Sequence, residues 1–183
     1  MKELSLNILD ITENSVKAKA TLISITITED ADMLTISIAD NGTGMTEETV
    51  RNVTDPFYTT RTTRKVGMGL PLFKFAAEQT GGTLAVNSKH FESFPDSSGT
   101  TVTATFYKKH IDFTPLGDVI SSLTTLIQGH PDIDFVYRHD IDGTTVASLD
   151  TRELRAVLED VPLDTFEVLT WINENLAEQY NSI

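Results

Sequence analysis

Pairs of short segments in which apolar and polar residues alternate constrain the fold of this chain most strongly. The segment "TLISITITED" sets Leu22 and three isoleucines among threonines and a serine, and "MLTISIADN" repeats the pattern after residues 29–32. Such alternation puts apolar side chains on one face of a strand, and a short polar insert between two strands is typical of a hairpin. "GTLAVNSK" and "GTTVTATFYKK" form a second pair around a polar turn at residues 95–98. The sequence therefore predicts a largely antiparallel sheet.

Segments with helical features precede and separate these strands. Residues 5–18 carry leucine and valine at roughly helical spacing, which predicts an opening helix. Thr46, followed by two glutamates, is typical of a helix start, and residues 71–81 begin with proline and end with glycine, as helices commonly do. The order α-ββ-α-α-ββ predicts an α+β fold: a two-layer α/β sandwich with a mixed, largely antiparallel sheet and helices on one face.

The composition changes near residue 111. Residues 111–183 hold 14 acidic residues and three arginines, a net charge of −11 out of −13 for the whole chain. We therefore expect two regions, a larger domain at 1–110 and a small acidic α/β appendage at 111–183, joined near the loop-like segment 110–115. The strong negative charge makes nucleic acid an unsuitable partner.

The acidic region has its own pattern of elements. "PLGDVISSLTTLIQGH" predicts a helix, and "DFVYRHDIDGTTVASLD" a hairpin that turns at Asp142 and Gly143. Two final helices are expected after Asp150 and Asp164, each of which has a glutamate three residues later. Three apolar residues of the last helix are interpreted as core, with a docking face as the alternative: Phe166, Trp171 and Leu176.

General features of the composition limit the class of protein. The chain has no cysteine, which excludes disulfides, thiolate nucleophiles and cysteine metal sites. It contains no apolar run near the ~18 residues that span a bilayer, and Met1-Lys2-Glu3 does not open a secretory signal. We expect a cytoplasmic protein that does not bind membranes.

Asp10 and Asn14 form the first candidate polar pair. They lie four residues apart, so a helix would present both on the same face. A carboxylate and an amide aimed together can hold a hydrated Mg²⁺, or a water molecule, beside a phosphate. The alternative is an ordinary solvated helix face.

The second candidate group follows a predicted strand, in "DNGTG". A carboxylate at the end of a strand, here Asp40, can accept a hydrogen bond from an exocyclic amine. Gly42 and Gly44 would allow a flat base to approach the backbone. The alternative is a turn without a ligand, because Asp-Asn-Gly is itself a common turn sequence.

The third group, residues 59–70, collects hydroxyl groups, the cations Arg61, Arg64 and Lys65, and the sequence Gly67-Met68-Gly69 before a predicted helix. Backbone N–H groups at the start of a helix form an anion site. The spacing matches neither a Walker A loop nor a dinucleotide fingerprint.

Together and in this order, the motifs resemble the ATP-binding domain shared by sensor histidine kinases, DNA gyrase B, Hsp90 and MutL proteins. "DITENSVKA" is similar to the N box, "DNGTGM" to the G1 box, "DPFYTTR" to the F box of the kinases, "GMGL" to the G2 box and "SGTTVTATF" to the last box. The resemblance covers residues 5–107. It implies that the chain binds ATP and Mg²⁺.

The resemblance also implies roles for individual residues. Asn14 would ligate Mg²⁺, Asp40 would bind the adenine amino group with support from Thr100, and Asp10 stands where gyrase-like members have the glutamate that activates water. Residues 59–65 would form a lid that Arg61 closes on the phosphates. The full set of implied binding residues is Asn14, Lys17, Asp40, Gly42, Gly44, Arg61, Gly67, Met68, Gly69, Leu70 and Thr100.

The chain also departs from the kinase pattern. Lys65 stands where kinases often have a third glycine, and no helical hairpin with a phospho-accepting histidine precedes the N box. The four histidines, His90, His110, His130 and His139, are interpreted as surface residues. We therefore expect not a self-phosphorylating kinase but one of three functions. These are a stand-alone ATPase or kinase-like regulator of another protein, a nucleotide-gated binding module, and a subunit that serves a histidine-bearing partner.

Overall fold

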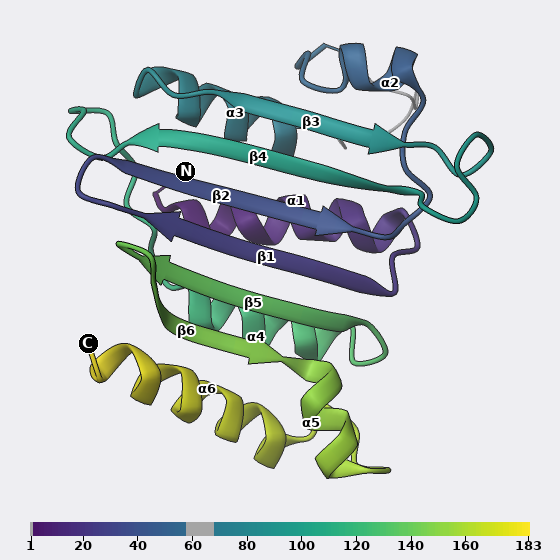
Figure 1. The fold of residues 1–183 in the computed structure, drawn as a ribbon, viewed down its shortest axis with the longest axis vertical. Helices are drawn as coiled ribbons and strands as arrows, with labels where there is room; N and C mark the ends of the chain where they lie inside the picture. The colour runs from purple at the N-terminus through teal and green to yellow at the C-terminus, as the bar shows by residue number, and fades with distance from the viewer. Residues whose placement is uncertain (1, 58–67) are drawn as a thin grey trace.

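The computed structural model describes residues 2–57 and 68–183. Its strands form a six-stranded sheet in the order β3-β4-β2-β1-β5-β6 (Figure 1). Neighbouring strands are antiparallel except for β1 and β5, which are parallel. The strands are β1 (Leu22–Glu29), β2 (Met33–Asp40), β3 (Leu84–Lys89), β4 (Gly99–Tyr107), β5 (Asp134–Ile141) and β6 (Thr144–Asp150).

Three of the helices cover one face of this sheet. Figure 1 shows α1, α3 and α4 behind the strands, while α5 and α6 lie at the end of the sheet beyond β6. The helices are α1 (Leu4–Lys17), α2 (Glu47–Asn52), α3 (Gly69–Gln79), α4 (Val119–Gly129), α5 (Thr151–Leu158) and α6 (Phe166–Asn181). The predicted two-layer sandwich with a mixed, largely antiparallel sheet is confirmed.

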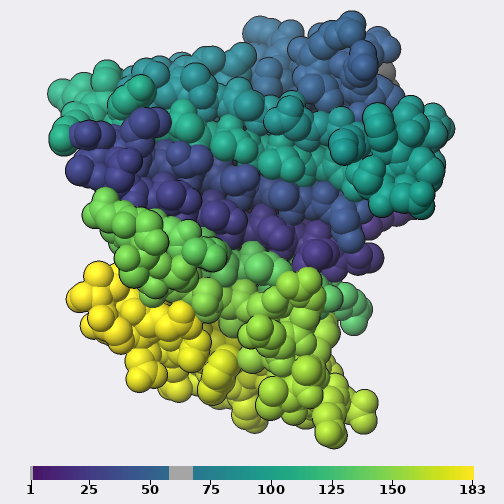
Figure 2. Space-filling view, viewed as in Figure 1, coloured from purple at the N-terminus to yellow at the C-terminus, as the bar shows by residue number. Residues whose placement is uncertain are grey.

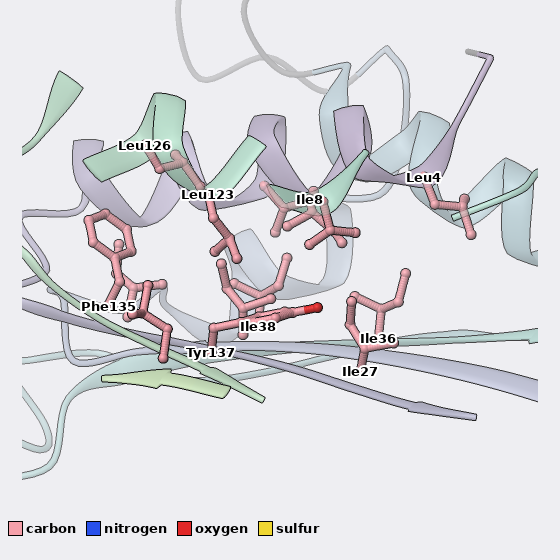
Figure 3. Close-up of a cluster of buried hydrophobic side chains, with 14 of the residues drawn as sticks. Leu4, Ile8, Ile27, Ile36, Ile38, Leu123, Leu126, Phe135 and Tyr137 are labelled. Carbon is pink, nitrogen blue, oxygen red and sulfur yellow. The ribbon is translucent and has the colours of Figure 1, made fainter. Parts of the chain in front are cut away.

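The core lies between the helices and one face of the sheet. The alternation in β1 buries Ile23, Ile25 and Ile27, while Ser24 and Thr26 between them remain partly exposed on the opposite face. Figure 3 shows Leu4 and Ile8 of α1 directed toward the isoleucines of the sheet. Full burial of one such side chain contributes roughly 1.5–3 kcal/mol, so this face fixes the strand register.

The acidic region continues the same sheet. β5 pairs with β1 so that Phe135 lies beside Ile23, and α4 packs next to α1, where the Ser122 hydroxyl donates to the carbonyl of Ser5 (3.2 Å). The buried residues of both regions belong to one hydrophobic cluster. The division into 1–110 and 111–183 stays a prediction about organisation, but the strands of both regions share backbone hydrogen bonds.

The predicted helix starts are mostly confirmed. Thr46 caps α2 by accepting from the N–H of Thr49 (3.3 Å), and Asp150 caps α5 by accepting from the N–H of Arg152 (2.9 Å). The predicted cap at Asp164 is wrong, because Thr165 holds the cap position of α6 and makes no side-chain cap bond. Asp164 and Thr165 are adjacent, and both residue types are good N-caps, so sequence spacing alone does not tell which of them caps the helix.

The interpretation of three residues of the last helix as core is confirmed for one of them and wrong for the other two. Leu176 is fully buried, but Trp171 is 48% exposed and Phe166 is 79% exposed. A step of five residues advances about 140° around a helix, so these three side chains point in different directions. Buried contacts of α6 are instead made by Val168, Leu169, Ile172 and Leu176.

The interpretation of His139 as a surface residue is wrong as well, since its exposed fraction is 2%. Its Nε2 lies 2.9 Å from a Glu29 carboxylate oxygen, which can only accept, so Nε2 carries the proton. Its Nδ1 then accepts from the Tyr180 hydroxyl (2.7 Å), which in turn contacts the hydroxyl of Tyr137. Lys108 donates to the other oxygen of Glu29 (2.6 Å). A neutral imidazole satisfies every group, and the network joins β1, β5 and α6 with Lys108, the residue that follows β4.

We expect this histidine to make folding stability depend on pH. Burial lowers the pKa of His139, outweighing the Glu29 hydrogen bond that raises it, whereas an unfolded histidine titrates near 6.5. As the pH falls below that value, the unfolded chain takes up a proton that the folded chain resists, so the free energy of unfolding decreases. Urea unfolding at pH values from about 5 to 7.5 should show this loss in the wild type and in His110→Gln, but not in His139→Gln. An unchanged pH slope in His139→Gln would contradict the assignment.

Candidate functional site

The carboxylate of Asp40 lies at the end of β2 and is held by three donors. Its Oδ1 accepts from the backbone N–H groups of Gly42 (2.9 Å) and Thr100 (3.2 Å). Its Oδ2 accepts from the Ser15 hydroxyl of α1 (2.6 Å). Thr100 is also the direct cross-strand partner of Asp40 in β4. The side chain is thus fixed in orientation from three elements of the fold.

A serine that the sequence analysis did not single out holds the loop after Asp40. The Ser88 hydroxyl lies 2.7 Å from the Thr100 hydroxyl and accepts from the N–H of Met45 (2.7 Å). Ser15 was likewise missed, because one serine in a helix has no pattern that distinguishes it. The roles of both serines become visible only in the tertiary structure.

The two glycines of this loop are required by close backbone contacts. A Cβ on Gly42 would lie 2.6 Å from the carbonyl oxygen of Ala18. Gly44 has φ +68°, and a Cβ there would lie 2.0 Å from the carbonyl oxygen of Lys89. Thr43 between them donates its N–H to Ala18 (2.8 Å). The loop is therefore packed between the end of α1 and the end of β3, and side chains are excluded at positions 42 and 44.

Asp10 and Asn14 lie on the side of α1 that faces the start of α3. The position of a Cβ on Gly69 would be 3.5 Å from the Cβ of Asp10 and 3.9 Å from Nδ2 of Asn14. Asp10 is exposed and Asn14 is partly buried. The predicted pair thus shares one helix face, and this face meets the glycine-containing start of the next helix.

The first turn of α3 has the features of an anion site. The helix begins at Gly69, two residues before the predicted start at Pro71, and its cap residue Met68 makes no side-chain cap bond. Leu70 is buried and anchors the turn, while Met68 is exposed. The N–H groups of the first turn have no partner within an α-helix, and the helix dipole favours an anion beside them.

α1 connects the two halves of the candidate site. Asn14 faces α3, and the next residue, Ser15, donates to Asp40. Lys17, in the last turn of the same helix, is exposed. Arg61, Gly67 and the predicted lid at 59–65 lie outside the described residues.

The described residues form no cluster of side chains that could bind a metal ion without a ligand's help. Within residues 2–57 and 68–183, no group of three or more histidine, aspartate or glutamate side chains could hold a metal ion. No helix in the same part of the chain is both long and apolar enough to cross a bilayer.

Comparisons with known proteins agree with this arrangement. Residues 2–110 match the family described as histidine kinase-, DNA gyrase B- and HSP90-like ATPase. The heme sensor protein HssS of Staphylococcus saprophyticus is 31% identical over 98 residues, which are 52% of this chain and 20% of that protein. The chain therefore spans about a fifth of the length of this curated relative.

Solved structures are similar in fold at low sequence identity. The N-terminal domain of a DNA repair protein matches with a TM-score of 0.53 and 18% identity, over 81% of this chain and 53% of that chain. The mycobacterial sensor histidine kinase MprB matches with a TM-score of 0.42 and 18% identity, over 57% and 72%. Coverage of 81% means that the likeness in fold to the repair protein extends beyond residue 110.

The family match covers more than half of the chain and includes the described elements that meet around Asp40 and the start of α3. The chain belongs to the family of histidine kinase-, DNA gyrase B- and HSP90-like ATPases.

Proposed function

We propose that this protein binds ATP with Mg²⁺ and hydrolyses it, or transfers its phosphoryl group to a separate protein. The observation that carries this proposal is the state of the Asp40 carboxylate. A carboxylate has about four acceptor positions. Three are taken, by Gly42, Thr100 and Ser15, and the remaining one suits a single N–H donor such as the adenine amino group.

The phosphates would lie at the start of α3. The N–H groups of Gly69 and Leu70, which have no acceptor within the helix, and the helix dipole both favour an anion there. Because Asn14 and Ser15 are consecutive in α1, the purine and phosphate ends of the site are held at a fixed separation by one helix. Lys17 is a further cation on that helix.

The residues present fit a magnesium ion that is held mainly by the phosphates and by water, and not one bound by protein side chains alone. Asn14 offers a neutral amide oxygen, and Mg²⁺ usually keeps several waters while bound through few protein groups and the phosphates of its substrate. Bound there, the ion would neutralise phosphate charge. The role of Asn14 is then to orient the phosphates and their counter-ion.

Asp10 supplies the chemical step in this proposal. It precedes Asn14 by one helical turn, and its carboxylate is open to solvent. As a general base, it would accept a proton from a water molecule or a protein hydroxyl that attacks the γ-phosphate. Asn14 would position the phosphates for that attack.

The first test is selectivity measured by calorimetry. ATP should bind at least tenfold more tightly than GTP, because guanine presents a carbonyl where Asp40 requires a donor. Chelation of Mg²⁺ should weaken ATP binding to the wild type, and Asn14→Ala should remove that dependence. Asn52→Ala, in the separate helix α2, is the matched control. Equal affinity for ATP and GTP would refute the proposal.

One observation favours a second function, a nucleotide-gated binding module without catalysis. The Asp10 side chain makes no hydrogen bond with any residue in the described part of the chain, so nothing there orients it as a base. In such a module, Asp40, Asn14 and the phosphate site would suffice, and ATP would act by changing the surface presented to a protein partner.

A further inference from the structure

An apolar groove lies between α5 and α6, outside the segment that the family model matches. Its volume is about 650 Å³. Figure 2 shows these last two helices side by side at the end of the molecule farthest from β3. The groove is lined by Leu154, Val157, Leu158, Val161, Thr165, Glu167, Val168 and Trp171.

The groove leaves large apolar side chains exposed to water. Val157 is 81% exposed, and Val161 and Trp171 are each 48% exposed. Phe166, the first residue of α6, is exposed as well. Contiguous apolar surface of this kind marks a contact site for a partner, whereas single exposed apolar residues do not.

A second hollow, of about 290 Å³, lies beside the groove. Leu154 and Trp171 line both, so the indole stands where the two spaces meet. The second hollow reaches Val136 and Leu149 on the strands β5 and β6. The site is therefore elongated, as a groove for a helix is, rather than a closed pocket for a small molecule.

The charged residues that line the groove and the second hollow are mainly acidic: Glu167 in the groove, and Asp150 and Glu153 beside Arg138 in the second hollow. Arg138 is paired with Asp140. Residues 151–183 contain seven acidic residues and two arginines. Arg152 is paired with Asp150 and Arg155 with Asp134, so both arginines are turned to acids that precede α5. None of the seven forms a salt bridge with a residue of the described chain; they are Glu153, Glu159, Asp160, Asp164, Glu167, Glu174 and Glu178.

The neighbouring sheet edge does not offer a place for an added strand. β6 is the last strand of the sheet, and its outward backbone groups at Ser148 are already bonded. The Gln179 amide accepts from the N–H of Ser148 (2.8 Å) and donates to its carbonyl (3.1 Å). Backbone pairing with an added strand is therefore blocked at Ser148, whereas the apolar groove is open.

We propose that the groove binds a basic amphipathic helix of another protein. The apolar face of such a helix would cover Val157 and Trp171, and flanking lysines or arginines would meet the acidic rim. A second copy of this chain is a poor occupant, since two acidic rims would face each other. An anionic membrane surface would be repelled for the same reason.

Trp171 allows a direct test, because it is the single tryptophan of the chain. The probe is a synthetic amphipathic helix of leucine and lysine, about 18 residues long so that it forms a stable helix. Titration into the full chain should shift the tryptophan emission to shorter wavelength, and added salt should weaken the effect. Val157→Asp should weaken binding at least tenfold, whereas Ile111→Asp, at a 94% exposed position outside the groove, should bind as the wild type does.

Two control peptides and two further measurements distinguish a basic helix from a second copy of this chain and from a membrane surface. Replacing every lysine of the probe by glutamate, or scrambling its order, should abolish the shift. The proposal is overturned if either control peptide shifts the emission equally or if Val157→Asp binds normally. It is also overturned if sedimentation shows a wild-type dimer that Val157→Asp dissociates, or if neutral phosphatidylcholine vesicles shift the emission as the peptide does.

Discussion

Replacing Asp10 by asparagine should lower phosphate release, or phosphoryl transfer to a protein hydroxyl, by at least tenfold. A positioned general base typically contributes 10²–10⁴-fold to a rate. The substitution preserves shape and removes the proton acceptor, and Asp10 does not approach the Asp40 carboxylate network. ATP affinity should consequently stay close to that of the wild type. The measurement is steady-state phosphate release, with and without a candidate protein acceptor, together with calorimetry of ATP.

Glu13→Gln is the matched control for this experiment. It removes a carboxylate from the same helix, at a position whose side chain contacts His130 instead of the start of α3. This variant should turn over ATP as the wild type does. If Asp10→Asn and the wild type release phosphate at the same rate, the protein is not a catalyst that uses this residue. The nucleotide-gated module is then the better description.

Asp40→Asn should weaken adenine nucleotide binding by at least tenfold. The new amide has one acceptor oxygen in place of two, so it cannot accept from Gly42, Thr100 and Ser15 and also from the adenine amine. Its NH₂ group would face a donor, and an unpaired buried polar group costs about 1–3 kcal/mol. ADP and ATP should lose affinity equally, because both present the same base.

Asp30→Asn provides the corresponding control at a distance from the site. Asp30 also accepts from two backbone N–H groups, those of Asp32 and Met33, but in the turn between β1 and β2. Comparing the thermal midpoints of the two variants separates a folding defect from a loss of binding. Retention of wild-type affinity in a folded Asp40→Asn protein would contradict the assignment of the purine site.

The sequence predicted the parts of the fold that depend on local pattern. Alternation in β1 and β2, the turn between them and the cap at Thr46 each depend on residues within a few positions of one another. The pair Asp10 and Asn14 was predictable because residues four apart share a helix face, and Asp40 with Gly44 because both lie in the short loop after a strand. All four lie at the candidate site.

The remaining features depend on contacts between distant segments. Nothing in "DFVYRHDI" indicates that β5 pairs with β1 in parallel, because strand partners are chosen by packing and not by local sequence. His139 was expected at the surface, since neither Glu29 nor Tyr180 is near it in the chain. Ser15 and Ser88 gain their roles in the same way. Tertiary contacts decide such positions, and local propensity does not.

The parallel pairing of β1 with β5 has a consequence for the order in which the chain can fold during synthesis. β1 ends at residue 29, but the strand that covers its second edge is complete only at residue 141. At about 5–20 residues per second, this interval lasts on the order of 10 s. Throughout it, an isoleucine-rich strand presents unpaired backbone groups to other nascent chains, which is the usual route to aggregation. We therefore expect the acidic segment to dock late, and its long-range pairing with β1 to slow folding.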